Sequence, residues 1–429
     1  MARYYHAQQV ILDKCRGHLT CLRRCPTEAI RVKKGKARIS DDLCIDCGIC
    51  ISVCPSNAIV PLVDAIDGIS NYKYKVVVPS PVLYSQFDPQ IHPYIIHLAF
   101  KNLGFDLVVD EAIVIPSLEK ALIRYIEEHR SQLPLISPHC PAIVRLIQVN
   151  YPNLTEHILP IEVPREAAAR EIKLKLQNEQ GLKPEEIGII FISPCPAKIV
   201  SIKQPAEKSS SWFDSAFSIQ DVYPLLLAQV KTISQTFDES MVPKDFVFNL
   251  GWSTLGSISR STGMENWLAV SGIDHVKKIF DDIENSHLSN IEFVEALSCM
   301  LGCIGGPYIV ENPYVVRANN KKQRDKYTTN SSQIPEGFEE RYKSGYYFLQ
   351  GAIKPRPTKF FDTDLQTSIR KLKEREKIYS RLPQTDCGLC GAPTCRAFAE
   401  DVVRGEADLF NCIIFTAPDT TDNRELIVP

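Results

Sequence analysis

Two cysteine-rich runs near the N-terminus have the spacing of iron-binding loops. The second run, CIDCGICISVCP, follows the pattern Cys-x2-Cys-x2-Cys-x3-Cys-Pro, in which thiolates hold a [4Fe-4S] cluster. Its cysteines are Cys44, Cys47, Cys50 and Cys54. The first run, CRGHLTCLRRCP, has the same spacing but places His18 where the second cysteine would be. Its cysteines are Cys15, Cys21 and Cys25.

The two runs predict a pair of clusters that share their ligands. In two-cluster ferredoxins the fourth cysteine of each run binds the other cluster, so Cys25 joins the second run and Cys54 joins the first. Imidazole binds iron in Rieske centres, which makes His18 a predicted ligand. The alternatives are a surface His18 beside a lost or three-iron cluster and, for the second run, structural zinc. Each run is expected to end in a Cys-Pro turn and a short helix, at 26–30 and 55–59.

A third cysteine-rich stretch, DCGLCGAPTCRAFAEDVVRGEADLFNC, lies near the C-terminus. Gly388 and Gly391 allow the backbone to pass close to a bulky ligand. Apolar positions from Thr394 to Leu409 recur at helical spacing, so the last cysteine follows a helix. Four thiolates could bind zinc, but the stretch resembles the small four-cysteine [4Fe-4S] domain of several bacterial electron-transfer proteins. Its cysteines are Cys387, Cys390, Cys395 and Cys412.

The elements that must position the remaining cysteines alternate in type along the middle of the chain. The strand candidates are KVVVPSP, FDLVVDE, IGIIFIS, FVFNL and IEFVEAL, and the helix candidates include SLEKALIRYIEEH and DVYPLLLAQVKTI. This alternation predicts an α/β fold with parallel or mixed sheets flanked by helices. We expect it beside an α+β two-cluster ferredoxin domain and a small helical Fe–S domain.

The four middle cysteines come just after strand-like runs, where α/β folds place their sites. Pro141 suits the first turn of a helix, whose dipole would stabilise the thiolate of the preceding cysteine. The alternative is that all four are buried and unreactive. They are Cys140, Cys195, Cys299 and Cys303.

Three motifs around these cysteines resemble the signatures of the [FeFe]-hydrogenase catalytic domain, approximately TSCCP, MPCxxK and ExMxCxGGC. The chain has SPHCP (137–141), SPCPAK (193–198) and EALSCMLGC (295–303) in the same order. The resemblance implies that the four cysteines hold the [4Fe-4S] cubane of an H-cluster. It also implies that Cys303 bridges to a diiron subcluster carrying CO, cyanide and a dithiolate bridge.

Further roles follow from the same resemblance. Lys198 matches a lysine that hydrogen-bonds a cyanide ligand, a charge-assisted contact; the alternative is a solvated lysine on a helix. Ser80 and Pro81 match, more weakly, the strand end beside the diiron unit. Glu295 is retained in the third signature, and Glu119 matches one glutamate of the family's proton relay.

Departures from the family signatures predict a slow site. His139 replaces the cysteine that passes protons to the bridge amine, although an imidazole can itself carry protons near neutral pH. Ser193 and Leu297 replace methionines that pack the diiron unit. The pattern resembles the sensory branch of the family, in which H2 is reported rather than turned over quickly; this step is an analogy.

The sequence therefore predicts an enzyme that catalyses H2 = 2 H+ + 2 e-, at low activity and for H2 or redox sensing. Electrons would pass through three accessory [4Fe-4S] clusters to a ferredoxin-like or signalling partner, and maturation proteins would supply the diiron unit. The alternative is a catalytically silent electron-transfer or scaffold protein without that unit. A ferredoxin-dependent oxidoreductase is disfavoured because the chain lacks nucleotide-binding glycine motifs.

Composition limits the remaining possibilities. The 429 residues carry a net charge of -2, which does not favour nucleic acid or an anionic membrane. No apolar run is long enough for a bilayer span, and no secretion signal is evident, so we expect a cytoplasmic protein. In that compartment fifteen cysteines indicate metal rather than disulfides. With His18 they give the sixteen ligands that four clusters need. The neutral imidazole should raise the reduction potential of the cluster that His18 binds, which would make this cluster the terminal electron acceptor.

Five segments are predicted from this layout. They are a two-cluster ferredoxin-like domain (1–70), an H-cluster domain (71–350), a linker and helix (351–382), a four-cysteine domain (383–415) and a tail (416–429).

Overall fold

The apolar runs in the middle of the chain form two parallel sheets, as the computed structural model shows for residues 4–329, 334, 336–356 and 364–415. The chain divides into two units, which are described separately. Unit 1 comprises residues 4–9, 45–48 and the described part of 60–356; unit 2 comprises 10–44, 49–59 and the described part of 357–429.

The larger sheet of unit 1 has the strand order β6-β5-β8-β9, and every neighbouring pair is parallel. Its strands are β5 (Tyr74–Pro79), β6 (Leu107–Val108), β8 (Ile187–Ser193) and β9 (Ser215–Ser218). β8 is buried along its whole length, which explains its continuous apolar sequence. The smaller sheet has the order β10-β11-β7 and is also parallel. Its strands are β7 (Leu135–Ile136), β10 (Trp267–Ser271) and β11 (Phe293–Leu297). The predicted α/β fold is confirmed.

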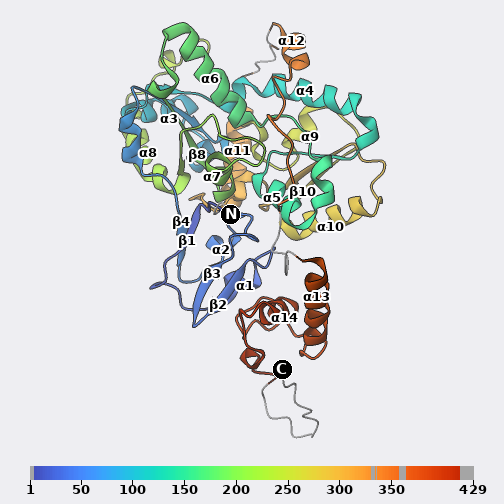
Figure 1. Cartoon of the computed structure of the whole chain (residues 1–429). Helices are drawn as coiled ribbons and strands as arrows, with labels where there is room; N and C mark the ends of the chain where they lie inside the picture. The colour runs from blue at the N-terminus through green and yellow to red at the C-terminus, as the bar shows by residue number, and fades with distance from the viewer. Residues whose placement is uncertain (1–3, 330–333, 335, 357–363, 416–429) are drawn as a thin grey trace, which may run out of the picture. The chain divides into compact units, whose positions relative to one another are not determined.

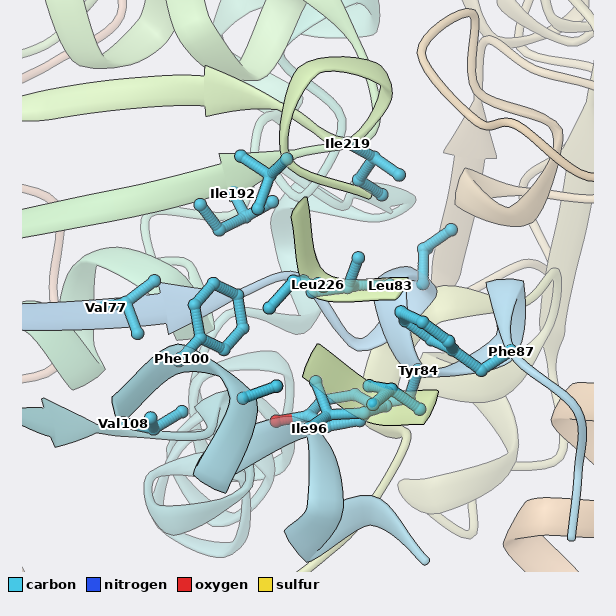
Figure 2. Packing of buried hydrophobic residues seen from close by; sticks show 14 of the residues in the cluster. Val77, Leu83, Tyr84, Phe87, Ile96, Phe100, Val108, Ile192, Ile219 and Leu226 are labelled. Atoms are coloured by element: carbon cyan, nitrogen blue, oxygen red, sulfur yellow. The ribbon is translucent and has the colours of Figure 1, made fainter. Parts of the chain in front are cut away.

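Helices cover both sheets because the connections between parallel strands must cross from one end to the other. α3 and α8 lie side by side (Figure 1). They bury Phe100 and Leu226 against Val77 and Ile192 of the sheet (Figure 2). The helices of unit 1 are α3 (Pro93–Asn102), α4 (Ile115–Glu128), α5 (Pro141–Asn150), α6 (Pro164–Gln180), α7 (Pro196–Lys203), α8 (Ile219–Ile233), α9 (Ser257–Ser261), α10 (Ile273–Glu284), α11 (Pro313–Tyr327) and α12 (Phe338–Lys343).

One predicted strand is wrong. FVFNL (246–250) forms no strand, although Phe248 is fully buried. The backbone N–H of Phe248 donates to Thr329 Oγ1 at 2.8 Å, and its carbonyl accepts from Thr329 N at 3.0 Å. The segment therefore satisfies its polar groups by a local contact with the end of α11, and its hydrophobicity reflects burial of side chains in the core.

Unit 2 contains two small modules. The N-terminal module has α1 (Thr20–Arg23), α2 (Ile49–Ser52) and the antiparallel pair β2 (Ile30–Lys33) and β3 (Lys36–Ile39). The C-terminal module packs α13 (Leu365–Tyr379) against α14 (Cys395–Val403), in agreement with the predicted small helical domain. Elsewhere β1 (Gln8–Val10) pairs with β4 (Ile59–Pro61).

The short helices predicted after the Cys-Pro turns are wrong. Residues 26–30 and 55–59 form turns that lead into strands, and the short helices α1 and α2 lie inside the cysteine loops instead. The five segment boundaries stay a prediction, and the tail 416–429 lies outside the described residues. No described helix has both the length and the apolar character needed to cross a bilayer.

Candidate functional site

The four middle cysteines meet at the carboxyl ends of strands from both sheets. Cys195 follows β8 and caps α7, Cys140 follows β7 and caps α5, and the loop after β11 supplies the other two. All four line one cavity, together with Cys47. These thiols are far apart in sequence, and they are neighbours because each follows the carboxyl end of a parallel strand. They are Cys140, Cys195, Cys299 and Cys303.

The chemistry of this cavity fits a metal cluster. Burial raises the pKa of the Cys195 thiol to about 12, with a smaller opposing effect from Lys198. Burial also raises the pKa of Cys299 well above its usual value, and neighbouring thiols including Cys47 add to the rise. All fifteen cysteines are free of disulfides. A bound metal deprotonates the thiols that coordinate it, and soft thiolates favour iron–sulfur clusters.

The segment just after Cys303 is held close to the end of β8. Gly306 N–H donates to Cys303 O at 3.0 Å, and Tyr308 N–H donates to Pro194 O at 2.9 Å. A Cβ on Gly306 would lie 2.4 Å from that same Pro194 oxygen. Only glycine permits this approach, which brings the loop beside Cys195.

Two buried cations lie beside this cysteine set. Lys198 on α7 is 2% exposed, and no acidic side chain of the described residues lies within ion-pair distance of its ammonium group. Arg165, at the start of α6, donates from Nη2 to Ser201 Oγ at 3.1 Å. Its Nε and Nη1 have no hydrogen-bond partner in the described part of the chain. Lys198 lines the cavity of the four cysteines, and Arg165 lines an adjoining cavity that shares Pro141 with it. Burial raises the pKa of Cys303, while Lys198 and Arg165 lower it.

A single buried carboxylate accompanies these cations. Burial raises the pKa of Glu111, and Lys198 and then Arg165 lower it. Its Oε1 has no hydrogen-bond partner within the described residues. Buried charges and buried donors without partners are costly, so the pocket is suited to an additional anionic ligand with acceptor atoms.

His139 lies next to the cysteine that is predicted to bridge the two parts of the cluster. Its Nε2 is 3.9 Å from Cys303 Sγ, and its ring packs edge-to-face on Trp252 with centroids 6.0 Å apart. Burial lowers the pKa of His139 well below its usual value, and Lys198 and Arg165 lower it further.

Four smaller predicted residues lie at the strand ends. Ser80 is fully buried at the end of β5, and its Oγ has no hydrogen-bond partner among the described residues. Pro81 follows it and starts a 3-10 helix over Pro81–Gln86. Ser193 Oγ donates to the Cys195 carbonyl at 2.7 Å and so shapes the ligand turn. Leu297 lines the same cavity as the four cysteines.

Glu295 has a structural set of partners. Its Oε1 accepts from Gly256 N at 2.8 Å, and its Oε2 accepts from Ser259 N at 2.9 Å and Ser259 Oγ at 3.0 Å. These contacts cap α9 and support the loop that carries Trp252. Trp252 Nε1 donates to Glu119 Oε1 at 3.2 Å. The predicted catalytic role of Glu295 stays a prediction.

The predicted His18 set is also brought together. One cavity in unit 2 is lined by all four side chains. Backbone N–H groups point at two of the sulfurs, from Ala58 to Cys54 Sγ at 3.2 Å and from Ala37 to Cys15 Sγ at 3.4 Å. Such N–H donors stabilise thiolates. The four side chains are Cys15, His18, Cys21 and Cys54.

The remaining predicted ligands lie in similar surroundings. Cys44 and Cys50 are buried, and Cys25 Sγ accepts from Ala29 N at 3.2 Å. At the C-terminus one cavity of unit 2 is lined by all four cysteines of that stretch. They are Cys387, Cys390, Cys395 and Cys412. None of the cavities above groups the predicted set of Cys25, Cys44, Cys47 and Cys50 among the described residues, and Cys47 lines the cavity of the middle cysteines. All ligand roles stay predictions.

Sequence reasoning missed Arg165 and Glu111. Both follow short apolar runs that give no sign of a buried charge, and neither lies in a cysteine motif. Pro164, a frequent first residue of helices, was the available signal that Arg165 starts a helix. A groove of about 920 Å3 between α3 and α6 was also not predicted. It holds none of the predicted ligands, so its size does not make it the metal site.

Three family models match the chain. Residues 73–246 match "Iron only hydrogenase large subunit, C-terminal domain". Residues 8–55 match a "4Fe-4S dicluster domain", and residues 382–414 match an "FeS" model for an iron–sulfur cluster.

Curated relatives cover parts of the chain. The NADP-reducing hydrogenase subunit HndD of Solidesulfovibrio fructosivorans is 22% identical over 187 residues, which are 39% of this chain and 32% of that protein. A component of the ion-translocating oxidoreductase complex of Thiobacillus denitrificans is 57% identical over 37 residues, which are 9% of this chain and 20% of that protein. The chain thus spans 20% to 32% of the length of these two relatives.

A solved structure shares the fold. The [FeFe]-hydrogenase HydA1 of Chlamydomonas reinhardtii superposes with a TM-score of 0.50 at 14% sequence identity. The superposition covers 69% of this chain and 97% of that one. At this identity the likeness concerns the fold.

Proposed function

We propose that the chain is a divergent member of the iron-only hydrogenase family with iron–sulfur domains, and that it reacts with H2 at an H-cluster held by unit 1. The reaction is H2 = 2 H+ + 2 e-, and slow turnover would serve H2 or redox sensing. Three accessory [4Fe-4S] clusters would carry the electrons. The expected partners are a redox or signalling protein and the hydrogenase maturation proteins, in the cytoplasm.

The observation that carries this proposal is a set of four partly buried cysteines that line one cavity together with the buried Lys198, with the buried Arg165 close by. Four thiolates alone would suit any iron–sulfur cubane. Lys198 and the two unpartnered nitrogens of Arg165 call for something more, because a cubane bound by cysteines does not occupy their donors. An anionic group with acceptor atoms next to Cys303 would satisfy them, and cyanide ligands have that character.

When bound, the H-cluster supplies the heterolytic cleavage of H2. The chain's residues bind and orient the cluster: Cys303 would bridge its two parts, and Lys198 and Arg165 would donate hydrogen bonds to its anionic ligands. His139 lies beside Cys303, with its Nε2 3.9 Å from Cys303 Sγ. Burial disfavours the charged form of this imidazole, and the slow proton delivery expected from it supports the proposal of low turnover.

The second candidate is an electron-transfer or scaffold protein that holds the cubane without a diiron unit. The specific observation in its favour is the loss of relay and packing residues, at His139, Ser193 and Leu297. A protein that does not turn over H2 needs neither the proton-relay residues nor the methionines that pack the diiron unit. Arg165 argues for the first candidate, because two of its buried nitrogens have no hydrogen-bond partner among the described residues and an anionic ligand would accept from them.

Infrared spectroscopy after maturation with the hydrogenase maturases separates the two candidates. We expect CO and CN stretching bands, together with iron and acid-labile sulfide for four clusters and the diiron unit. Lys198→Ala should abolish H2 oxidation while the iron–sulfur content stays nearly intact. Normal iron and sulfide without CO or CN bands would establish the second candidate instead.

A further inference from the structure

Within unit 2, the C-terminal four-cysteine module lies directly on β2 of the N-terminal module. Val32 N–H donates to Gly391 O at 2.9 Å, which is a backbone contact between distant segments of the sequence. Gly391 has φ +86°, and a Cβ at this position would lie 2.0 Å from Val32 O. No side chain fits there. The close backbone approach thus depends on glycine at the position after Cys390.

A buried ion pair flanks this backbone contact. Arg31 Nε donates to Asp401 Oδ2 at 2.6 Å, and Arg31 Nη2 donates to Asp401 Oδ1 at 3.0 Å. The two side chains are 16% and 7% exposed. Paired N–H donors on one carboxylate fix both distance and orientation, unlike a solvated lysine pair. Lys33 adds a bond from Nζ to the Glu406 carbonyl at 2.7 Å.

The contact also joins the two cysteine loops. Arg23 lies between Cys21 and Cys25, and its Nη2 donates to the carbonyl of Cys387 at 2.6 Å. A Cβ on the adjacent Gly388 would lie 3.3 Å from Leu22 Cδ2, so the loop packs on α1 as well. Arg23 is exposed, and its single bond would have little effect alone. Together with the pair on Asp401 it gives the interface a defined register.

We propose that residues 23–33 form an intramolecular docking surface, which holds the C-terminal four-cysteine module at a fixed distance from the His18 loop. The module is then a docked domain, in contrast to a tethered carrier that moves between partners. The surface is matched to this chain's own module by charge, by a bidentate ion pair and by a glycine contact. An outside redox partner must therefore approach the module on another face.

The docking itself does not depend on the proposed function, but its purpose, electron transfer between clusters, rests on it. Metal sites on a fixed pair of modules keep one separation, and electron exchange between them does not wait for a domain motion. The cavity lined by Cys15, His18, Cys21 and Cys54 then has the C-terminal module as its neighbour. The His18 site would be an internal relay station, which revises its predicted place as the terminal acceptor.

Two glycine variants provide a matched test. Gly391→Ala adds a methyl group at φ +86°, against Val32; Gly405→Ala adds one at φ +72°, where no atom lies within 4 Å. Both changes strain the backbone, but only the first obstructs docking. In the full-length, metal-loaded protein we expect the Val32 amide to exchange with solvent at least tenfold faster in Gly391→Ala and at the wild-type rate in Gly405→Ala.

A second pair of variants avoids the cysteine loops. Arg31→Gln and Asp401→Asn each remove one partner of the ion pair and should speed Val32 exchange, whereas the double variant should show no further increase. In the variants with faster Val32 exchange, the electron paramagnetic resonance spectrum of the reduced protein should lose the broadening caused by cluster–cluster interaction, while the iron content stays unchanged. Rapid Val32 exchange in the wild type, or equal exchange in both glycine variants, would establish a tethered module. The infrared bands of unit 1 report on the proposed function independently.

Discussion

Arg165→Met gives the sharpest test of the anionic ligand. Methionine has a similar length and no hydrogen-bonding hydrogens, so the change removes a buried charge without adding a polar group. Two of the guanidinium nitrogens have no partner among the residues that the structure describes, and each buried unpaired donor costs about 1–3 kcal/mol. The lost bond to Ser201 contributes about 1 kcal/mol, and Ser201 still donates to the Lys198 carbonyl at 2.7 Å. The cluster-free protein should therefore become more stable, by about 1–5 kcal/mol.

In the protein that holds the diiron unit, Arg165→Met should be destabilising instead of stabilising. A hydrogen bond to a charged group contributes about 1.5–3 kcal/mol, which corresponds to roughly a 10- to 150-fold loss in retention of the unit. The assay compares thermal unfolding of the cluster-free protein with the loss of CO and CN bands from the loaded protein in rising denaturant.

Arg170→Met is the matched control. Arg170 lies on the same helix, is also buried, and likewise has two nitrogens without partners among the described residues. It stacks on Tyr346, with 3.9 Å from its Cζ to the ring centroid, and lines the groove between α3 and α6. Its substitution should change the loaded and cluster-free proteins equally. If Arg165→Met destabilised the cluster-free protein, or if both variants retained the diiron unit as the wild type does, the assigned role of Arg165 would be wrong.

Three further predictions concern other buried groups. Lys208→Ala removes a 2% exposed ammonium that pairs with two buried glutamates at 3.3 and 2.9 Å, and should cost about 3–5 kcal/mol in denaturant unfolding; a cost below about 1 kcal/mol would show that water replaces it. His139→Cys restores a proton-transfer thiol and should raise the turnover number for H2; an unchanged rate would locate the limit elsewhere. His18→Cys adds a negative charge to its cluster and should lower the reduction potential in a redox titration, whereas a constant or higher potential contradicts iron ligation by His18.

Local sequence was enough for the elements whose signal is short-ranged. Continuous apolar runs such as IGIIFIS became buried parallel strands, because both faces of such a strand are covered. Pro141 was found at the first turn of α5, where its missing N–H has no cost. FVFNL was misjudged because burial of aromatic side chains looks the same in a strand and in a packed loop, and only its contact with Thr329 distinguishes them.

The sequence by itself determined the donor chemistry of this protein: the types and spacing of its thiols, and the odd imidazole among them. The types and spacing of these donors are local properties of short loops and do not depend on where the loops lie in the fold. Only the tertiary structure decided what surrounds the donors. The cavity shared by Lys198 and Cys303, and the contact of Gly391 with Val32, join segments far apart in the chain. Burial and close approach depend on how those segments pack, and no local pattern encodes them.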